Sequence, residues 1–182
     1  VSGKGSVIGA SMVADERIAG VMMTGSTKTA QLINQTLAQR NGPIVPLIAE
    51  TGGQNCMIVD SSALLEQVIS DVVHSAFDSA GQRCSALRVV YVQEEIADAF
   101  IAMLTGAMEV LTIGDPSALS TDIGPVIDKA SQILIQEHID KFKTSQQLIY
   151  QVANNQAMQH GSFIAPAAFL IDNLTSFTDE VF

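Results

Sequence analysis

Short apolar runs and one helical pattern alternate along the first third of the chain. Residues 19–23, 44–49 and 56–59 are apolar runs bounded by turn-forming residues. Runs of this length are typical of buried strands in a parallel sheet. After the turn at residues 24–27, apolar positions three and four apart predict a helix that ends near Gly42. Strand, turn, helix and strand in this order favour an α/β fold.

Helical periodicity dominates the remaining two thirds. Beyond the third apolar run, apolar pairs recur four residues apart and form one stripe, which predicts a helix with a buried face. The stripe consists of Leu64, Leu65, Val68, Ile69, Val72, Val73, Ala76 and Phe77. Further helices are predicted near residues 94–110 and 129–143, and further strands at 88–92, 148–152 and 163–171. Because helices separate most of these strands, we expect a largely parallel sheet.

Composition and charge narrow the class of protein. The chain has 182 residues, of which 47% are hydrophobic and 15% charged, enough for one substantial domain or a domain with part of another. No apolar run approaches the ~20 residues of a membrane-spanning helix, and no cationic leader opens the chain. The net charge of −10, from 19 acidic and 9 basic residues, argues against a nucleic-acid surface, which needs clustered Lys and Arg.

The cysteines and histidines argue against two further kinds of site. Cys56 and Cys84 form neither a disulfide framework nor a CxxC pair, so we expect a reduced, cytoplasmic chain. The three histidines are scattered and none forms a metal-ligand pair, so we expect no metal site. The chain starts at Val1 inside a glycine-punctuated loop and stops at Phe182 without a polar tail, which suggests a piece of a longer protein.

Cys84 is the most prominent candidate for covalent chemistry. It lies in a polar, glycine-containing loop between a predicted helix and a strand, and Arg83 beside it would favour the nucleophilic thiolate. The alternative is a small buried apolar side chain, the usual role of cysteine. The residues alone leave both interpretations of Cys84 open. Cys56, inside the apolar run Cys-Met-Ile-Val, is predicted to be buried and structural.

Glu50 is the candidate general base. It ends an apolar strand and is followed by Thr-Gly-Gly-Gln-Asn. A carboxylate at the tip of a buried strand can reach a site, where burial favours proton uptake. The alternative is an ordinary strand-end acid that faces solvent, and the local residues alone favour that alternative.

Six segments, in order along the chain, resemble landmarks of the aldehyde dehydrogenase superfamily. ETGGQN, from Glu50, resembles its glutamate motif, and GQRCSA, around Cys84, resembles its cysteine motif, 34 residues later as in the superfamily. The other four are TGST from Thr24, TDIGPVI from Thr121, GSFIAP from Gly161 and EVF from Glu180. The last resembles the first half of a glutamate-x-phenylalanine-glycine-proline motif. This ordered set is far more specific than any single motif.

A narrower resemblance bears on substrate and fold. Residues 75–86 resemble 1-pyrroline-5-carboxylate (glutamate-semialdehyde) dehydrogenases, and with residues 49–63 they resemble the C-terminal dehydrogenase part of bifunctional proline-utilisation proteins. Stand-alone enzymes of this specificity tend to carry Lys where Gln54 stands. The resemblance implies an α/β fragment of the aldehyde dehydrogenase fold. Residues 1–50 would be the end of a Rossmann-like NAD-binding domain, and residues 51–182 most of the catalytic domain, truncated at its C-terminus.

The activity implied by the resemblance is NAD-dependent oxidation of L-glutamate 5-semialdehyde to L-glutamate, the second step of proline degradation. Cys84 would be the nucleophile that forms a thiohemiacetal and then a thioester. Glu50 would activate the water that hydrolyses the thioester. Ser85 resembles the serine that binds the substrate carboxylate in family members.

Cofactor contacts are implied near both ends of the chain. Gly25 and Ser26 would open a helix whose N-terminal N–H groups favour the pyrophosphate of NAD. The family resemblance assigns Glu180 to the nicotinamide ribose and Phe182 to the ring region. NAD and NADP are not distinguished. FAD is expected only if a proline dehydrogenase domain precedes this segment in the parent protein.

Three alternatives stay open: another aldehyde dehydrogenase, a catalytically silent fragment of one, and a cysteine hydrolase. A hydrolase of the papain type needs a histidine base, and no histidine has a sequence context that points to Cys84. The expected partners are a small aldehyde substrate and, for the parent protein, further copies of itself.

Overall fold

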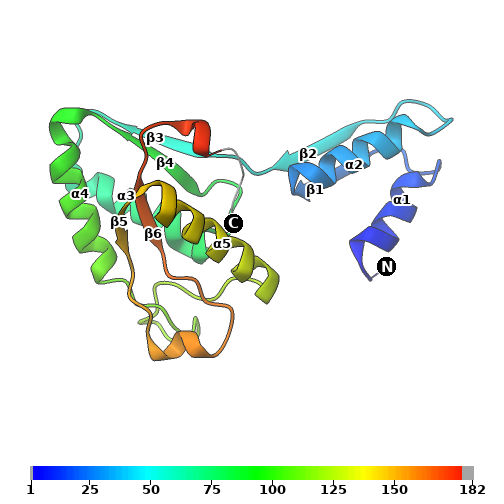
Figure 1. The fold of residues 1–182 in the computed structure, drawn as a ribbon. Coiled ribbons are helices and arrows are strands. Elements are labelled where there is room, and N and C mark those ends of the chain that lie inside the picture. Colours follow the sequence, from blue (N-terminus) through cyan, green and yellow to red (C-terminus); the bar gives the residue numbers. More distant parts are fainter. Residues whose placement is uncertain (1, 178–182) are drawn as a thin grey trace. The chain divides into compact units, whose positions relative to one another are not determined.

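Helices and strands alternate in two compact units, Val1–Gly53 and Gln54–Phe182, each of which is described by itself (Figure 1). The structure is a computed structural model and describes residues 2–177. Within these residues, no helix is long and apolar enough to cross a membrane. The mixed helix and strand content confirms the predicted α/β class.

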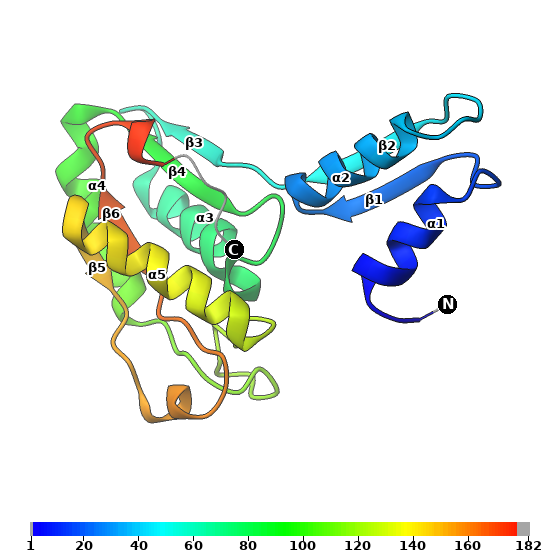
Figure 2. The same cartoon turned by 45° about the vertical axis from the view of Figure 1, so that its right-hand side comes forward.

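The first unit is built around one βαβ motif. Its elements are the π-helix η1 (Gly5–Gly9), α1 (Ala10–Ala14), β1 (Val21–Gly25), α2 (Thr27–Ala38) and β2 (Leu47–Thr51). The two strands pair in parallel, and Thr24 lies opposite Glu50. Helix α2 crosses from one strand to the other and packs against both, as the sequence pattern predicts (Figure 2).

In its described part, residues 54–177, the second unit has two pairs of strands and three long helices. Its elements are β3 (Asn55–Val59), α3 (Leu65–Phe77), the 3₁₀ helix η2 (Asp78–Gly81), β4 (Leu87–Val92), α4 (Glu94–Glu109), α5 (Lys129–Ser145), β5 (Gln147–Gln151), η3 (Gln156–Gln159), β6 (Ala167–Leu170) and η4 (Leu174–Ser176). Strands β3 and β4 pair in parallel across α3, whereas β5 and β6 pair antiparallel. The expected parallel arrangement therefore holds for two of the three pairs.

The last pair departs from the prediction because of its connection. Between β5 and β6 the chain forms only the short η3, with no crossover helix to carry it back to the starting edge, so the strands run antiparallel. The predicted strand at residues 163–171 also begins later, at Ala167. Phe163, Ile164 and Ala165 are buried without belonging to a strand, so their apolar run reflects core packing.

The larger of two hydrophobic clusters in the described part of the second unit joins most of its elements. It joins α3, β4 and α4 to the chain around β5 and β6. Its buried members are Ile69, Val72, Leu87, Phe100, Leu104, Met108, Ile113, Ile123, Val152, Phe163 and Ala165. The predicted apolar stripe of α3 supplies two of them, which confirms that this stripe faces the core. Figure 2 shows α3 beside the β3–β4 pair.

Candidate functional site

Cys84 lies at the corner of a tight turn between α3 and β4. The turn spans residues 83–86, and the Ala86 N–H donates to the Arg83 carbonyl oxygen at 3.1 Å. Cys84 and Ser85 occupy the two central positions and are both exposed, while Ala86 is fully buried. The fold thus presents the Cys84 thiol at the surface on a turn whose following residue is anchored in the core. The buried, purely structural interpretation of Cys84 is wrong.

The Asn55 side chain binds this turn from the neighbouring strand. Its Nδ2 donates to the Cys84 carbonyl oxygen at 2.7 Å and to the Ala86 carbonyl oxygen at 3.0 Å. Asn55 is the first residue of β3 and pairs with Leu87, and the register shifts immediately after it. Sequence analysis missed this role. The only available signal was the position of Asn55 as the last residue of ETGGQN.

The chain reaches the turn through a left-handed stretch of backbone. Ser79, Ala80 and Gly81 have φ values of 57°, 54° and 71°, a conformation that costs energy for residues with a Cβ atom. A Cβ atom on Gly81 would lie 2.9 Å from the Ala76 carbonyl oxygen. Arg88 Nη2 donates to the Gly81 carbonyl oxygen at 2.6 Å. Strained backbone next to an exposed cysteine is typical of functional loops.

Arg83 stabilises the end of α3. Its Nη2 donates to the carbonyl oxygens of His74 and Ser75 at 2.8 and 3.2 Å. These carbonyls lie in the last turn of α3, where the Asp78 N–H also donates to the His74 carbonyl oxygen. This nitrogen therefore caps the helix that leads into the cysteine loop, and the assistance of Arg83 to a thiolate stays a prediction.

Hydrogen bonds join the landmark segments of the second unit. The Gln82 amide donates to the Ser79 carbonyl oxygen at 2.8 Å and accepts from the Ile127 N–H at 2.7 Å. Val126 and Ser162 are joined twice, by a backbone hydrogen bond of 2.9 Å and by the Ser162 hydroxyl at 2.6 Å. GQRCSA, TDIGPVI and GSFIAP are therefore linked in space, and Asn55 adds ETGGQN.

In the first unit, Glu50, Gly25 and Ser26 gather at one edge of the β1–β2 pair. Glu50 lies opposite Thr24, the residue before Gly25, at the carboxyl ends of both strands. Ser26 caps α2, and its Oγ accepts from the Thr29 N–H at 3.2 Å. The carboxyl ends of parallel strands are where open α/β sheets bind ligands. Glu50 is exposed, so the burial expected at this strand tip is absent from the unit.

The remaining predictions concern Glu180 and Phe182, the burial of Cys56, and the pairing of Glu50 with Cys84. Glu180 and Phe182 lie outside the described residues. Cys56 is exposed, so its predicted burial is wrong. The reason is the alternation of β3: Met57 and Val59 face the core, whereas Cys56 and Ile58 point the other way. Glu50 and Cys84 belong to different units, so their predicted pairing stays a prediction.

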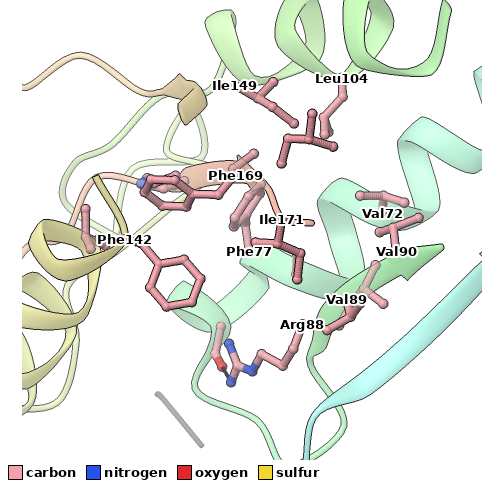
Figure 3. A pocket seen from close by; sticks show the side chains of 18 of the residues that line it. Val72, Phe77, Arg88, Val89, Val90, Leu104, Phe142, Ile149, Phe169 and Ile171 are labelled. Atoms are coloured by element: carbon pink, nitrogen blue, oxygen red, sulfur yellow. Dashed lines mark hydrogen bonds between the residues drawn. The ribbon is translucent and has the colours of Figure 1, made fainter. Parts of the chain in front are cut away.

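A cavity of about 530 Å³ lies between β4, β6 and the surrounding helices (Figure 3). Its labelled walls are mostly apolar side chains such as Val72, Phe77, Phe142 and Phe169, and Cys84 is not among its lining residues. Arg88 also lines the cavity, and its guanidinium donates to the Gly81 carbonyl oxygen. The cavity is therefore a space between packed layers, and the candidate chemistry lies on the neighbouring loop. Among residues 2–177, no group of three or more His, Cys, Asp or Glu could hold a metal ion.

Comparison with known proteins places this chain in one family. The profile described as "Aldehyde dehydrogenase family" matches residues 1–182. The chain is 48% identical to the bifunctional protein PutA of Klebsiella aerogenes and 47% identical to that of Escherichia coli K12, covering 99% of this chain and 14% of each relative. A crystal structure of a mutant proline utilization A (PutA) from Bradyrhizobium japonicum superposes with a TM-score of 0.95 at 50% identity, covering 100% of this chain and 18% of that one. The chain belongs to the aldehyde dehydrogenase family.

Proposed function

We propose that the full-length protein containing this chain oxidises L-glutamate 5-semialdehyde to L-glutamate with NAD, using Cys84 as nucleophile and Glu50 as general base. The observation that carries the proposal is the exposed Cys84 at the corner of a turn held from β3 by Asn55. The similarity to PutA proteins supports the substrate class. The chain spans about a seventh of the length of these curated relatives, so the remaining parts of the site lie elsewhere in the parent.

Cys84 would attack the aldehyde carbon as a thiolate and form a thiohemiacetal. The negative charge that develops on the substrate oxygen needs donors, and the backbone N–H of Cys84 is the one we assign. No oxygen of residues 2–177 accepts a hydrogen bond from this N–H, which leaves it available. Loss of hydride then gives a thioester on Cys84, which water must hydrolyse to release the acid.

Glu50 would activate that water. Its carboxylate is exposed at the carboxyl end of β2, where it can accept a proton from solvent. Residues 51–54 join Glu50 to Asn55, and five Cα–Cα steps span at most about 18 Å. Because Asn55 is bonded to the Cys84 turn, this short connection permits the pairing of Glu50 with Cys84 that we propose.

The first unit fits part of a dinucleotide site. Ser26 caps α2 and Gly25 ends β1, so the N-terminal N–H groups of a twelve-residue helix face the carboxyl edge of the strands. We assign Gly25 and Ser26 to the pyrophosphate, Glu180 to the nicotinamide ribose and Phe182 to the ring region. Bound NAD would accept the hydride. We also propose that the first unit is the end of the cofactor domain and the second most of the catalytic domain.

The test uses the full-length enzyme and a matched cysteine control. Cys84→Ala should abolish oxidation of glutamate semialdehyde, because no thioester can form. Glu50→Gln should retain one rapid turnover of NADH per active site and then hydrolyse the thioester slowly. Cys56→Ala, at the other exposed cysteine, should keep wild-type turnover. Stopped-flow absorbance of NADH separates the steps, and wild-type turnover by Cys84→Ala would refute the assignment.

A further inference from the structure

We propose that Asn55 is a positioning residue for the Cys84 nucleophile, an inference that rests on the proposed function. One amide nitrogen, Asn55 Nδ2, donates to both the Cys84 and Ala86 carbonyl oxygens, at 2.7 and 3.0 Å. These two carbonyls belong to the same turn, which the Ala86 N–H closes onto Arg83. A single side chain thus holds the turn on both sides of Ser85, its second central residue.

The turn depends on this amide for electrostatic reasons. Two carbonyl oxygens converge on one NH2 group, which supplies one hydrogen to each. Without the NH2 group, two partial negative charges would face each other with no donor between them, and the turn would relax apart. The Cys84 carbonyl carbon is bonded to the Cα atom that carries the cysteine side chain. Rotation of that peptide group therefore moves the nucleophile.

Asn55 is itself held firmly. It begins β3, pairs with Leu87 across the sheet, and sits next to the register shift that lets its side chain reach the turn. The core residue Val59 ends the same strand. The Asn55 amide therefore fixes the position of the Cys84 turn relative to the β3–β4 pair. Since a misplacement of about 1 Å can cost about a hundredfold in rate, this coupling should appear in catalysis.

A second asparagine provides a matched control. Asn155 Nδ2 donates to the Ile113 carbonyl oxygen at 2.8 Å, a side chain to backbone hydrogen bond of the same kind in the same unit. It makes no hydrogen bond to residues 83–86. Asn155→Ala and Asn155→Asp therefore report the general cost of losing such a bond.

The experiment compares Asn55→Ala and Asn55→Asp with the two Asn155 variants in the full-length enzyme. The Asp substitution keeps the shape of Asn but replaces the donor by an oxygen that repels both carbonyls. We expect both Asn55 variants to lower the rate of the first NADH turnover about a hundredfold. We expect the KM for NAD and the melting temperature to change no more than in the Asn155 variants. The pH profile of Cys84 alkylation by iodoacetamide, followed by peptide mass spectrometry, should also change.

The outcomes separate this inference from the proposed function. A first-turnover rate and alkylation profile in Asn55→Ala equal to those of Asn155→Ala would overturn the positioning role. If Asn55→Ala fails to fold, Asn55→Asp and its alkylation profile decide the question on the same terms. If Cys84→Ala retains activity, the proposed function fails instead. The alkylation profile still tests whether Asn55 controls the Cys84 turn.

Discussion

Ser85 stands beside Cys84 at the second corner of the turn and, like Cys84, is exposed. Its hydroxyl therefore lies on the same hydrogen-bonded turn as the thiol. A substrate whose aldehyde carbon meets Cys84 can present a second polar group to Ser85. In glutamate semialdehyde that group is the carboxylate, which a hydroxyl can bind by a charge-assisted hydrogen bond.

Ser85→Ala is expected to weaken binding of the carboxylate-bearing substrate only. A hydrogen bond to a charged group contributes about 1.5–3 kcal/mol, so the KM for glutamate semialdehyde should rise roughly ten- to a hundredfold. Propanal, which lacks a carboxylate, serves as the control and should show an unchanged KM. Steady-state kinetics with both aldehydes measures the difference. Equal increases for the two substrates would contradict a role in carboxylate recognition.

The two cysteines illustrate how far residue-level reasoning extends. The residues around Cys84 left its exposure open, and the structure shows that it is exposed. The apolar neighbours of Cys56 suggested burial, and the structure disagrees because an exposed residue can alternate with buried ones along a strand. Apolar composition identified β3 correctly, but it did not identify which face of β3 is covered.

At the level of elements, the junction between α3 and β4 determines where the nucleophile lies. The helix ends at Phe77, residues 79–81 have positive φ, and Arg83 returns to bind carbonyls in the last turn of the same helix. The chain therefore folds back on its own helix before it enters β4. This compact reversal keeps the cysteine turn close to the first residue of β3.

Gly81→Ala should disrupt this junction, and Gly106→Ala is its control. A left-handed conformation costs an alanine about 1–2 kcal/mol, and its Cβ would also meet the Ala76 carbonyl oxygen at 2.9 Å. Gly106 lies in helix α4 with open space around it, so alanine there should stabilise by about 1 kcal/mol. We expect the melting temperature of the full-length enzyme to fall with Gly81→Ala and to rise with Gly106→Ala. Shifts of the same sign would contradict this account.

At the level of the whole molecule, apolar side chains on strands remain open to solvent. Met22 of β1 is 79% exposed and Ile58 of β3 is 78% exposed. Both lie on strand faces, where apolar residues normally pack against another layer. Within residues 2–53, the first unit also contributes only two strands to any cofactor-binding sheet.

We therefore expect the 182-residue chain, expressed alone, to bind NAD weakly, to lack dehydrogenase activity and to self-associate. Dinucleotide folds hold the cofactor across strands from both halves of their sheet, and exposed apolar surface favours association. Calorimetric titration with NAD, an aldehyde-dependent NADH assay and analytical ultracentrifugation test these three properties. The full-length enzyme is the positive control. Micromolar NAD binding with measurable turnover by a monomeric chain would show that the site is self-contained.

The sequence by itself determined the local elements and the family. Helices α2, α3, α4 and α5 and the parallel strand pairs follow from apolar periodicity, a property of residues close together in the chain. The ordered motifs around Glu50 and Cys84 likewise identified the aldehyde dehydrogenase family, which the comparisons confirm.

Only the tertiary structure decided how the cysteine turn is held. The Asn55 amide meets carbonyls 29 and 31 residues away, and Gln82 meets Ile127 45 residues away. Such contacts depend on where two separately folded segments lie in space, and no pattern within either segment specifies that distance. Local sequence determines which element forms, whereas packing between distant elements determines which side chain meets which carbonyl.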